Sequence, residues 1–430
     1  MRQKPPLLTI CLLALALSAY LTAPAMRSAS ARATAEPTLD AMIGQMLMLG
    51  FEGTSPDAAG SRRMRRLAAE GKIGGVILMD RNIRSPAQTR ALVASIRGDL
   101  AGPGLFVAVD QEGGLVQRLS SRKGFNAYPT ASTVARLYAP ERARQVYETM
   151  ARELAAAGFN MNFGPVVDLN LNRTNPIIGR LGRSYGSDPD KVTQYARAFV
   201  DAHRAYGIVT AAKHFPGHGS SWGDSHEEFI DLSKTWKEVE LSPYRQLAGS
   251  GSMDMVMIGH LYHPAFSGGK RLPATLSPTA IDGWVRDRLG FSGVVITDDM
   301  EMGAIKRYHS LNAAAVMAVN SGNDILLYSN AGRDPQFAEK LITTIRQAVE
   351  SGQIPRSRIE TAYARIMRLR ESMRVVQASL PEVATVGTIP PPVLSEAVPA
   401  QRAAPLPAAS APPPEPEERR GLLRRLRDYF

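Results

Sequence analysis

Between residues 39 and 374, hydrophobic and polar positions follow two alternating patterns. Short, continuous apolar runs recur along the chain, and longer stretches with apolar positions at helical spacing separate them. Eight of the apolar runs are predicted strands: MLMLGF, GGVILM, LFVAVD, MNFGPVVDL, VTAAKHF, DMVMIGHL, GVVITDD and DILLYS. Continuous apolar runs are typical of strands that are buried on both faces of a parallel sheet. Eight strand–helix units in about 335 residues therefore predict an α/β fold, a TIM-type (β/α)8 barrel with insertions, as one domain over residues 36–375.

The same alternation permits a doubly wound open sheet, and polar residues at the strand ends help to decide between the two folds. Five of the predicted strands end on titratable side chains: Asp110, Asp168, Lys213 with His214, His260, and Asp298. The carboxyl ends of barrel strands converge on one mouth, where active sites lie. An open sheet would spread several of these side chains too far apart to cooperate, so the pattern favours the barrel.

The first 35 residues differ from the rest in composition. A basic start precedes an apolar run from Leu7 to Leu21, and small residues then offer Ala-x-Ala sites that end at Ala25, Ala31 or Ala35. This layout predicts a secretory signal peptide, with a retained N-terminal anchor as the alternative. Cys11, the single cysteine, follows the bulky Ile10, which argues against a lipoprotein cleavage site. We expect an exported protein of the periplasm or cell envelope, without disulfides.

The C-terminal end also changes character. Eleven of the 30 prolines lie between Pro381 and Pro416, so residues 376–418 are expected to form an extended linker. Residues 419–430 then place Leu422, Leu426 and Tyr429 on one helical face among arginines. Such a tail can associate with an anionic membrane or the cell wall, or dock on a partner. The alternative is a frayed tail that only aids solubility.

Composition and charge narrow the function classes. The hydrophobic content of 44% and charged content of 21% are those of a globular protein with a sizeable core. The formal charge is +11, and removal of the predicted signal peptide would leave +7 because its four basic residues precede the first acid, Glu36. A moderate positive charge fits an anionic environment. No basic helix or aromatic-basic motif indicates nucleic acid as a partner.

The segment KHFPGHGSSWGDSH, Lys213–His226, holds three of the seven histidines. On a helix, His214 and His218 would present two metal ligands together, but Pro216 and Gly217 between them disfavour a helix. Without a cysteine, a metal site would need further ligands from Asp224, His226 and the distant His260. We therefore expect neither a metal nor another cofactor.

Two features of the chain can perform acid–base and nucleophilic chemistry. Asp298 ends a buried strand, and side-chain alternation turns it and Asp299 in opposite directions, so one carboxylate should face the mouth while Asp299 holds the following turn. Such a carboxylate can attack an electrophilic carbon or bind sugar hydroxyls. Asp224 lies two residues before His226, where it can orient the imidazole as a general acid/base.

Three motifs in this order, AVDQEGGLVQRL (Ala108–Leu119), KHFPGHGSSWGDSH (Lys213–His226) and VVITDDMEMGAI (Val294–Ile305), resemble glycoside hydrolase family 3. More narrowly, they are similar to its bacterial β-N-acetylglucosaminidases of the peptidoglycan-recycling type. The resemblance extends from about Ile43 to Met373 and covers nearly the whole predicted barrel.

The resemblance implies a role for each matching residue. Asp298 would be the nucleophile of a retaining exo-β-N-acetylglucosaminidase, and His226, oriented by Asp224, its mobile acid/base. The groups implied to bind the terminal GlcNAc unit are Asp110, Arg118, Arg183, Lys213 and His214, with Arg180 as a competitor for the position of Arg183. The implied substrates are GlcNAc-containing muropeptides or glycan strands, and a monomer is expected.

Other interpretations of the same residues remain open. Asp110 and the following QEGG, Gln111–Gly114, could form a turn at the barrel rim with a structural carboxylate. Lys213 could pair with Asp168 or Asp110 only for stability, and His214 could be a core histidine. His260 and His263 are expected to pack or to support other groups. A β-glucosidase of the same family, or an inactive barrel that binds cell wall, would share the fold.

Overall fold

The computed structural model describes residues 36–98 and 104–379. The predicted signal peptide, nearly all of the Pro-rich linker and the basic tail lie outside the described residues. Within them, no helix combines the length and the apolar character that a membrane crossing requires.

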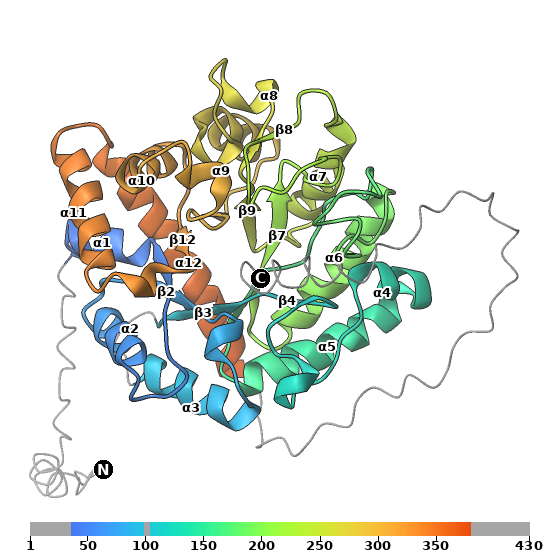
Figure 1. Ribbon diagram of the computed structural model, residues 1–430, viewed down its shortest axis with the longest axis horizontal. Helices are drawn as coiled ribbons and strands as arrows, with labels where there is room; N and C mark the ends of the chain where they lie inside the picture. The colour runs from blue at the N-terminus through green and yellow to red at the C-terminus, as the bar shows by residue number, and fades with distance from the viewer. Residues whose placement is uncertain (1–35, 99–103, 380–430) are drawn as a thin grey trace, which may run out of the picture. The chain divides into compact units, whose positions relative to one another are not determined.

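Eight parallel strands form the centre of the barrel, and they coincide with the eight apolar runs of the sequence (Figure 1). In spatial order, which is also chain order, they are β1 (Leu47–Gly50), β2 (Gly75–Ile77), β3 (Phe106–Val109), β6 (Met161–Asn162), β7 (Val209–Phe215), β9 (Met255–Ile258), β11 (Val294–Thr297) and β12 (Leu326–Tyr328). Every residue of these strands is buried, as a sheet covered on both faces requires.

Ladder pairing connects the strands from β11 through β9, β7, β6, β3, β2 and β1 to β12, and the two ends of this series, β11 and β12, also meet. Ile296 forms a parallel bridge with Ile325, and the N–H of Thr297 donates to the Ile325 carbonyl at 3.0 Å. On its other side, β12 pairs in parallel with β1, where Leu47 lies opposite Leu326. The sheet therefore closes on itself, which confirms the TIM-type barrel and excludes the open sheet.

Helices surround the strands (Figure 1). The longer ones are α1 (Leu39–Gln45), α2 (Ala59–Ala69), α3 (Pro86–Arg97), α4 (Ala131–Leu137), α5 (Pro140–Ala156), α6 (Pro189–Arg204), α7 (Ser242–Gly249), a π-type helix at Thr279–Arg288, α10 (Leu311–Asn320), α11 (Phe337–Glu350) and α12 (Arg356–Ser379). The first helix, α1, packs against α11 and α12, which joins the beginning of the barrel to its end. Helix α12 ends at Ser379 and so includes the first four residues, 376–379, of the expected linker.

Local sequence explains where several helices begin. Before α3, the Ser85 hydroxyl accepts the N–H of Gln88 at 3.2 Å, and the Gln88 side chain accepts the N–H of Ser85 in return. This reciprocal cap satisfies backbone donors that the first turn leaves unpaired. Thr38 and Ser310 cap α1 and α10 in the simpler way, through one side-chain oxygen each.

Short elements decorate the carboxyl ends of the strands. A hairpin of β4 (Gln111–Gly113) and β5 (Val116–Gln117) follows β3, and β8 (Ile230–Asp231) pairs with β10 (Leu261–Tyr262) beyond β7 and β9. Small helices, α8 (Pro264–Ser267) and α9 (Gly303–Lys306), follow β10 and β11. These insertions build the walls of the site described next.

Candidate active site

A cavity of about 290 Å³ opens at the carboxyl ends of the strands. Its size is near the lower limit of small-molecule sites, about 300 Å³. Its polar wall brings together six of the eight predicted site residues, which are Asp110, Arg183, Lys213, His214, His226 and Asp298. Apolar side chains complete the wall, among them Ile77, Phe163, Met257 and Leu327.

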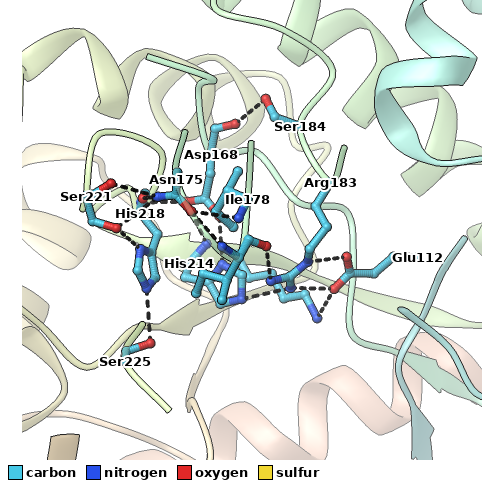
Figure 2. A network of polar contacts seen from close by, with 12 residues as sticks. Glu112, Asp168, Asn175, Ile178, Arg183, Ser184, His214, His218, Ser221 and Ser225 are labelled. Carbon is cyan, nitrogen blue, oxygen red and sulfur yellow. Dashed lines mark hydrogen bonds and ion pairs between the residues drawn. The ribbon is translucent and has the colours of Figure 1, made fainter. Parts of the chain in front are cut away.

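Four buried charges form one network at this cavity. The Lys213 ammonium lies 2.9 Å from the Asp110 carboxylate and 2.7 Å from the Glu112 carboxylate. Glu112 also accepts two bonds of 2.8 Å from the Arg183 guanidinium, so it joins the lysine to the arginine (Figure 2). A two-pronged arginine–carboxylate contact fixes the orientation of both partners.

The network settles the ionisation of its carboxylates. Burial raises the pKa of Glu112, but the charges of Arg183 and Lys213 outweigh it and lower that pKa to about 2. Burial likewise opposes the ionisation of Asp110, and Lys213 and Arg118 still hold its pKa well below the ordinary value. All four groups are therefore charged at neutral pH, and each contact joins a positive group to a negative one. These groups can offer directed hydrogen bonds to hydroxyl groups.

His214 is held by a second carboxylate. Its Nδ1–H donates to Asp168 at 2.7 Å, and Arg183 donates to its Nε2 over 3.4 Å (Figure 2). The other Asp168 oxygen accepts the backbone N–H groups of His214, at 3.2 Å, and of His218, at 2.8 Å. Asp168 thus fixes both the ring of His214 and the start of the loop that follows β7.

His218 holds the loop after β7 in place through hydrogen bonds within the loop. Its Nδ1 lies 2.7 Å from the Ser221 hydroxyl and its Nε2 lies 3.0 Å from the Ser225 hydroxyl (Figure 2). Asn175 donates to the His218 carbonyl at 2.8 Å and to the Ser221 hydroxyl at 2.9 Å. Burial lowers the pKa of His218 to about 4, so the ring is neutral at neutral pH.

His226 reaches the cavity from the far end of the same loop. Its Nδ1–H donates to the Asp224 carboxylate at 2.6 Å, and its backbone N–H donates to the same oxygen at 2.9 Å. The His226 carbonyl accepts the N–H of Gly303 at 2.9 Å, which docks the loop on α9. The predicted Asp224–His226 pair is therefore formed, and His226 lines the same cavity as Asp298.

Asp298 follows the last residue of β11. Its backbone N–H donates to the Ile258 carbonyl of β9 at 3.0 Å, which extends the sheet by one bond. Burial raises the pKa of Asp298, but the neighbouring imidazoles of His214, His260 and His226 outweigh it, and the pKa lies below its ordinary value. The carboxylate is therefore ionised, as a nucleophile must be.

Asp299 was expected to turn away from the mouth and hold the turn. It does hold the turn, since its carboxylate accepts the N–H of Glu301 at 3.1 Å and that of Ser329 at 3.2 Å. Asp299 is also among the residues that line the cavity, while its carboxylate is engaged by these bonds of the turn.

The two predicted arginines lie at different depths. Arg183 lines the cavity, whereas Arg180 is exposed and takes no part in its wall, which decides between these two candidates. Arg118 is buried behind Asp110, to which its guanidinium donates at 3.2 Å, and it does not line the cavity. Arg118 therefore acts on the site through Asp110. His260 supports the turn after β11, with its Nε2 at 2.8 Å from the Asp299 carbonyl.

The sequence analysis missed some residues of the site. Glu112 was treated as part of a turn, and Asp168 only as a strand-end residue or a structural partner of Lys213, which contacts Asp110 and Glu112 instead. The spacing Asp110-x-Glu112 carried a usable signal, because alternate residues of an extended segment share a face. Glu301, Lys306 and Arg333 also line the cavity, and no strand pattern indicated them, since they follow β11 and β12 on short helices and turns.

The metal hypothesis for the histidine-rich loop finds no support in its contacts. Both ring nitrogens of His218 are engaged by serine hydroxyls, and the Nδ1 of His214 is engaged by Asp168. Across residues 36–98 and 104–379, no group of three or more histidine, cysteine or acidic side chains is placed to hold a metal ion.

Comparison with known proteins gives the family. The sequence matches the glycosyl hydrolase family 3 N terminal domain over residues 38–369. It is 33% identical over 319 residues to a beta-hexosaminidase of Nitrosomonas eutropha, an alignment that covers 71% of this chain and 88% of the relative.

Solved structures agree with this match. A family 3 beta-N-acetylglucosaminidase from Paenibacillus sp. superposes with a TM-score of 0.71 at 31% identity, over 90% of this chain and 68% of that chain. A beta-N-acetylhexosaminidase from Beutenbergia cavernae gives 0.70 at 27% identity, over 78% of this chain and 98% of that one. The family expected from the three motifs is confirmed: the chain belongs to glycosyl hydrolase family 3 and is a glycoside hydrolase on a TIM-type barrel.

Proposed function

We propose that this protein is a retaining exo-β-N-acetylglucosaminidase that removes terminal GlcNAc from peptidoglycan fragments. The observation that carries the proposal is the meeting of Asp298 and His226 at one cavity, with His226 oriented by Asp224 at 2.6 Å. The names of the relatives, beta-hexosaminidase and beta-N-acetylglucosaminidase, support the choice of sugar.

Retention requires a nucleophile and a proton donor at the reacting carbon. In the proposed reaction, Asp298 attacks that carbon while His226 protonates the oxygen of the leaving sugar. The bond between the sugars breaks, and GlcNAc is held as an ester of Asp298. His226 then takes a proton from water, which attacks the same carbon and releases GlcNAc and the free carboxylate.

The buried charges have a separate task in this proposal. Asp110, Lys213, Arg183 and His214 would hydrogen-bond the hydroxyl groups of the terminal GlcNAc, and Arg118 and Glu112 would hold them in place. A cavity of about 290 Å³ accommodates a small unit rather than a chain, which supports removal of one terminal sugar at a time.

The decisive test compares nitrophenyl glycosides of GlcNAc and glucose. We expect kcat/KM for the GlcNAc glycoside to exceed that for the glucoside by about 100-fold or more, because a site built to bond a polar group rejects substrates that lack it. Asp298→Asn should lower kcat by about 10³-fold or more, since the nucleophile is lost. Proton NMR of the first product should show the β-anomer of GlcNAc.

Each arm can contradict part of the proposal. Preference for the glucoside would indicate the β-glucosidase, and no turnover of either would indicate a barrel that only binds. The α-anomer as first product would rule out the covalent step. Asp224→Asn serves as the acid/base control: it should slow release of a sugar leaving group more than release of nitrophenol, which leaves without protonation.

We also propose that the protein acts outside the cytoplasm. The basic and apolar start of the sequence, with its Ala-x-Ala sites, supports export to the periplasm or cell envelope. Export would bring the enzyme to peptidoglycan fragments as they are released from the wall. The C-terminal basic residues would add attraction to anionic surfaces, and the protein would act as a monomer.

A further inference from the structure

We propose that Lys306 and Arg333 form a recognition site for a carboxylate on the sugar that leaves. The inference rests on the proposed function and adds the part of the substrate that lies beyond the terminal GlcNAc. Unsubstituted muramic acid offers such a carboxylate in its lactyl group, and a peptide stem on the same sugar offers others.

Both cations lie on the wall of the cavity that holds Asp298 and His226. Lys306 is the last residue of α9, which follows β11, and Arg333 is the last residue of the short 3-10 helix Ala331–Arg333, which follows β12. Both residues are exposed, whereas the other two cations of the wall, Lys213 and Arg183, are only 3% and 4% exposed. The exposed pair therefore lies at the solvent side of the cavity, where the leaving sugar of an exo-acting enzyme must extend.

The two cations also differ from the buried pair in their partners. Lys213 and Arg183 are each in contact with carboxylates, at 2.7 and 2.8 Å. Among the residues that the structure describes, neither Lys306 nor Arg333 forms an ion pair in which a carboxylate lies within 4.0 Å of its charged nitrogens. The next acid along the chain, Asp334, is taken by Lys340 at 2.7 Å. Two cations on one wall are thus available to an anion from outside.

Glu301 also lines the cavity and interacts electrostatically with both cations, but it offsets their charge only in part. Its carboxylate accepts the N–H of Asn330 at 2.6 Å. Burial first and the charge of Asp299 second raise its pKa to about 7, against the opposing effects of Lys306 and Arg333. The wall at this point therefore keeps a net positive character at neutral pH, which matches a substrate with an acidic leaving sugar.

The test uses three disaccharide substrates and the double variant Lys306→Ala/Arg333→Ala in the full-length protein. The substrates are GlcNAc–muramic acid with a free lactyl carboxylate, its methyl ester, and neutral diacetylchitobiose. We expect the wild-type kcat/KM to favour the free acid over its ester by about tenfold at low salt, and the double variant to lose this preference. A muramyl-peptide arm separates stem carboxylates from the lactyl group, because its lactyl carboxylate is an amide.

Arg307→Ala is the matched control, because Arg307 is exposed, follows Lys306 directly and does not line the cavity. It removes one positive charge next to Lys306 but outside the cavity wall, and it should leave the acid-to-ester ratio unchanged. An equal kcat/KM for the acid and the ester in the wild type would overturn the inference. This comparison uses only the wild-type protein, so it does not depend on whether a variant folds. If the wild type still hydrolyses the nitrophenyl GlcNAc glycoside, the proposed glycosidase function is retained although the inference about the leaving sugar has failed.

Discussion

At the scale of single residues, the site depends on charges that would be costly to bury alone. Glu112 is 7% exposed and contacts two cations, Lys213 and Arg183. Removing ions from water costs several kcal/mol each, and only close partners offset that cost. Glu112 contacts the two cations that are proposed to bind sugar. The first effect of its negative charge is therefore to offset the cost of burying these cations.

Glu112→Gln should therefore destabilise the protein by about 3–5 kcal/mol, because it leaves Lys213 and Arg183 short of one negative charge. Urea unfolding followed by circular dichroism at pH 7 measures the change. Glu339→Gln is the control, since Glu339 is partly exposed and its ion pairs with Lys72 and Arg66 are long, at 3.5 and 3.9 Å. Its loss should cost about 1 kcal/mol or less.

The same variant carries a pH dependence with a definite sign. The folded pKa of Glu112, about 2, lies below its ordinary value of 4.5. A lowered carboxyl pKa contributes stability that is present above pH 4.5 and is lost as the pH falls toward 2. The stability difference between wild type and Glu112→Gln should accordingly shrink over this window. A difference that stays constant from pH 7 to pH 3 would contradict the charge-based explanation.

At the scale of elements, the acid/base loop and α9 fit together through one glycine. A Cβ placed on Gly303 would lie 2.5 Å from the Glu227 carbonyl oxygen and 2.7 Å from the His226 carbonyl oxygen. The φ angle of Gly303 is not in the left-handed region, so only this close approach requires glycine. The contact determines where His226 lies relative to Asp298.

Gly303→Ala should push the loop away from α9 and lower kcat by about 10- to 100-fold, because a shift of about 1 Å misplaces the imidazole. The loss should be greater for a disaccharide than for the nitrophenyl glycoside, whose leaving group does not need the proton from His226. Steady-state kinetics on both substrates measures it. Gly249→Ala at the end of α7 is the control, since a Cβ there meets no atom within 4 Å, and its kinetics should not change. An equal loss on both substrates would indicate general damage instead.

The barrel was predictable from the sequence, whereas much of its site was not. All eight strands were visible because burial on both faces leaves a continuous apolar run, such as VTAAKHF, that local pattern reveals. Asp298 and His226 were found from motifs. The analysis missed the site positions of Glu112 and Glu301 and the burial of Arg118. These features depend on contacts between segments that are far apart in the chain. Glu112, for example, meets Arg183 across 71 positions.

At the scale of the molecule, positive charge is distributed in two ways. The two buried cations of the barrel mouth, Lys213 and Arg183, are neutralised by carboxylates, while the sequence as a whole keeps a formal charge of +11. Net positive charge attracts the protein to anionic surfaces over about one Debye length, 8–10 Å, so the effect weakens with salt. Attraction of this kind would concentrate the enzyme where anionic wall fragments arise, and the arginines of the C-terminal tail would contribute to it.

A protein that ends at Ser379 tests this last idea. All helices and strands of the described barrel lie between Leu39 and Ser379, so removal of residues 380–430 deletes none of them. We therefore expect kcat and KM on the nitrophenyl GlcNAc glycoside to stay within about twofold of those of the full chain.

In cell fractionation at low salt, the full chain should sediment with membranes and wall, and the shortened chain should remain soluble. Raising the salt to about 0.5 M should release the full chain as well, because screening removes the attraction of arginines for anionic groups. Equal fractionation of the two proteins would contradict tethering by the tail, and a large fall in kcat would show that the tail contributes to the site instead.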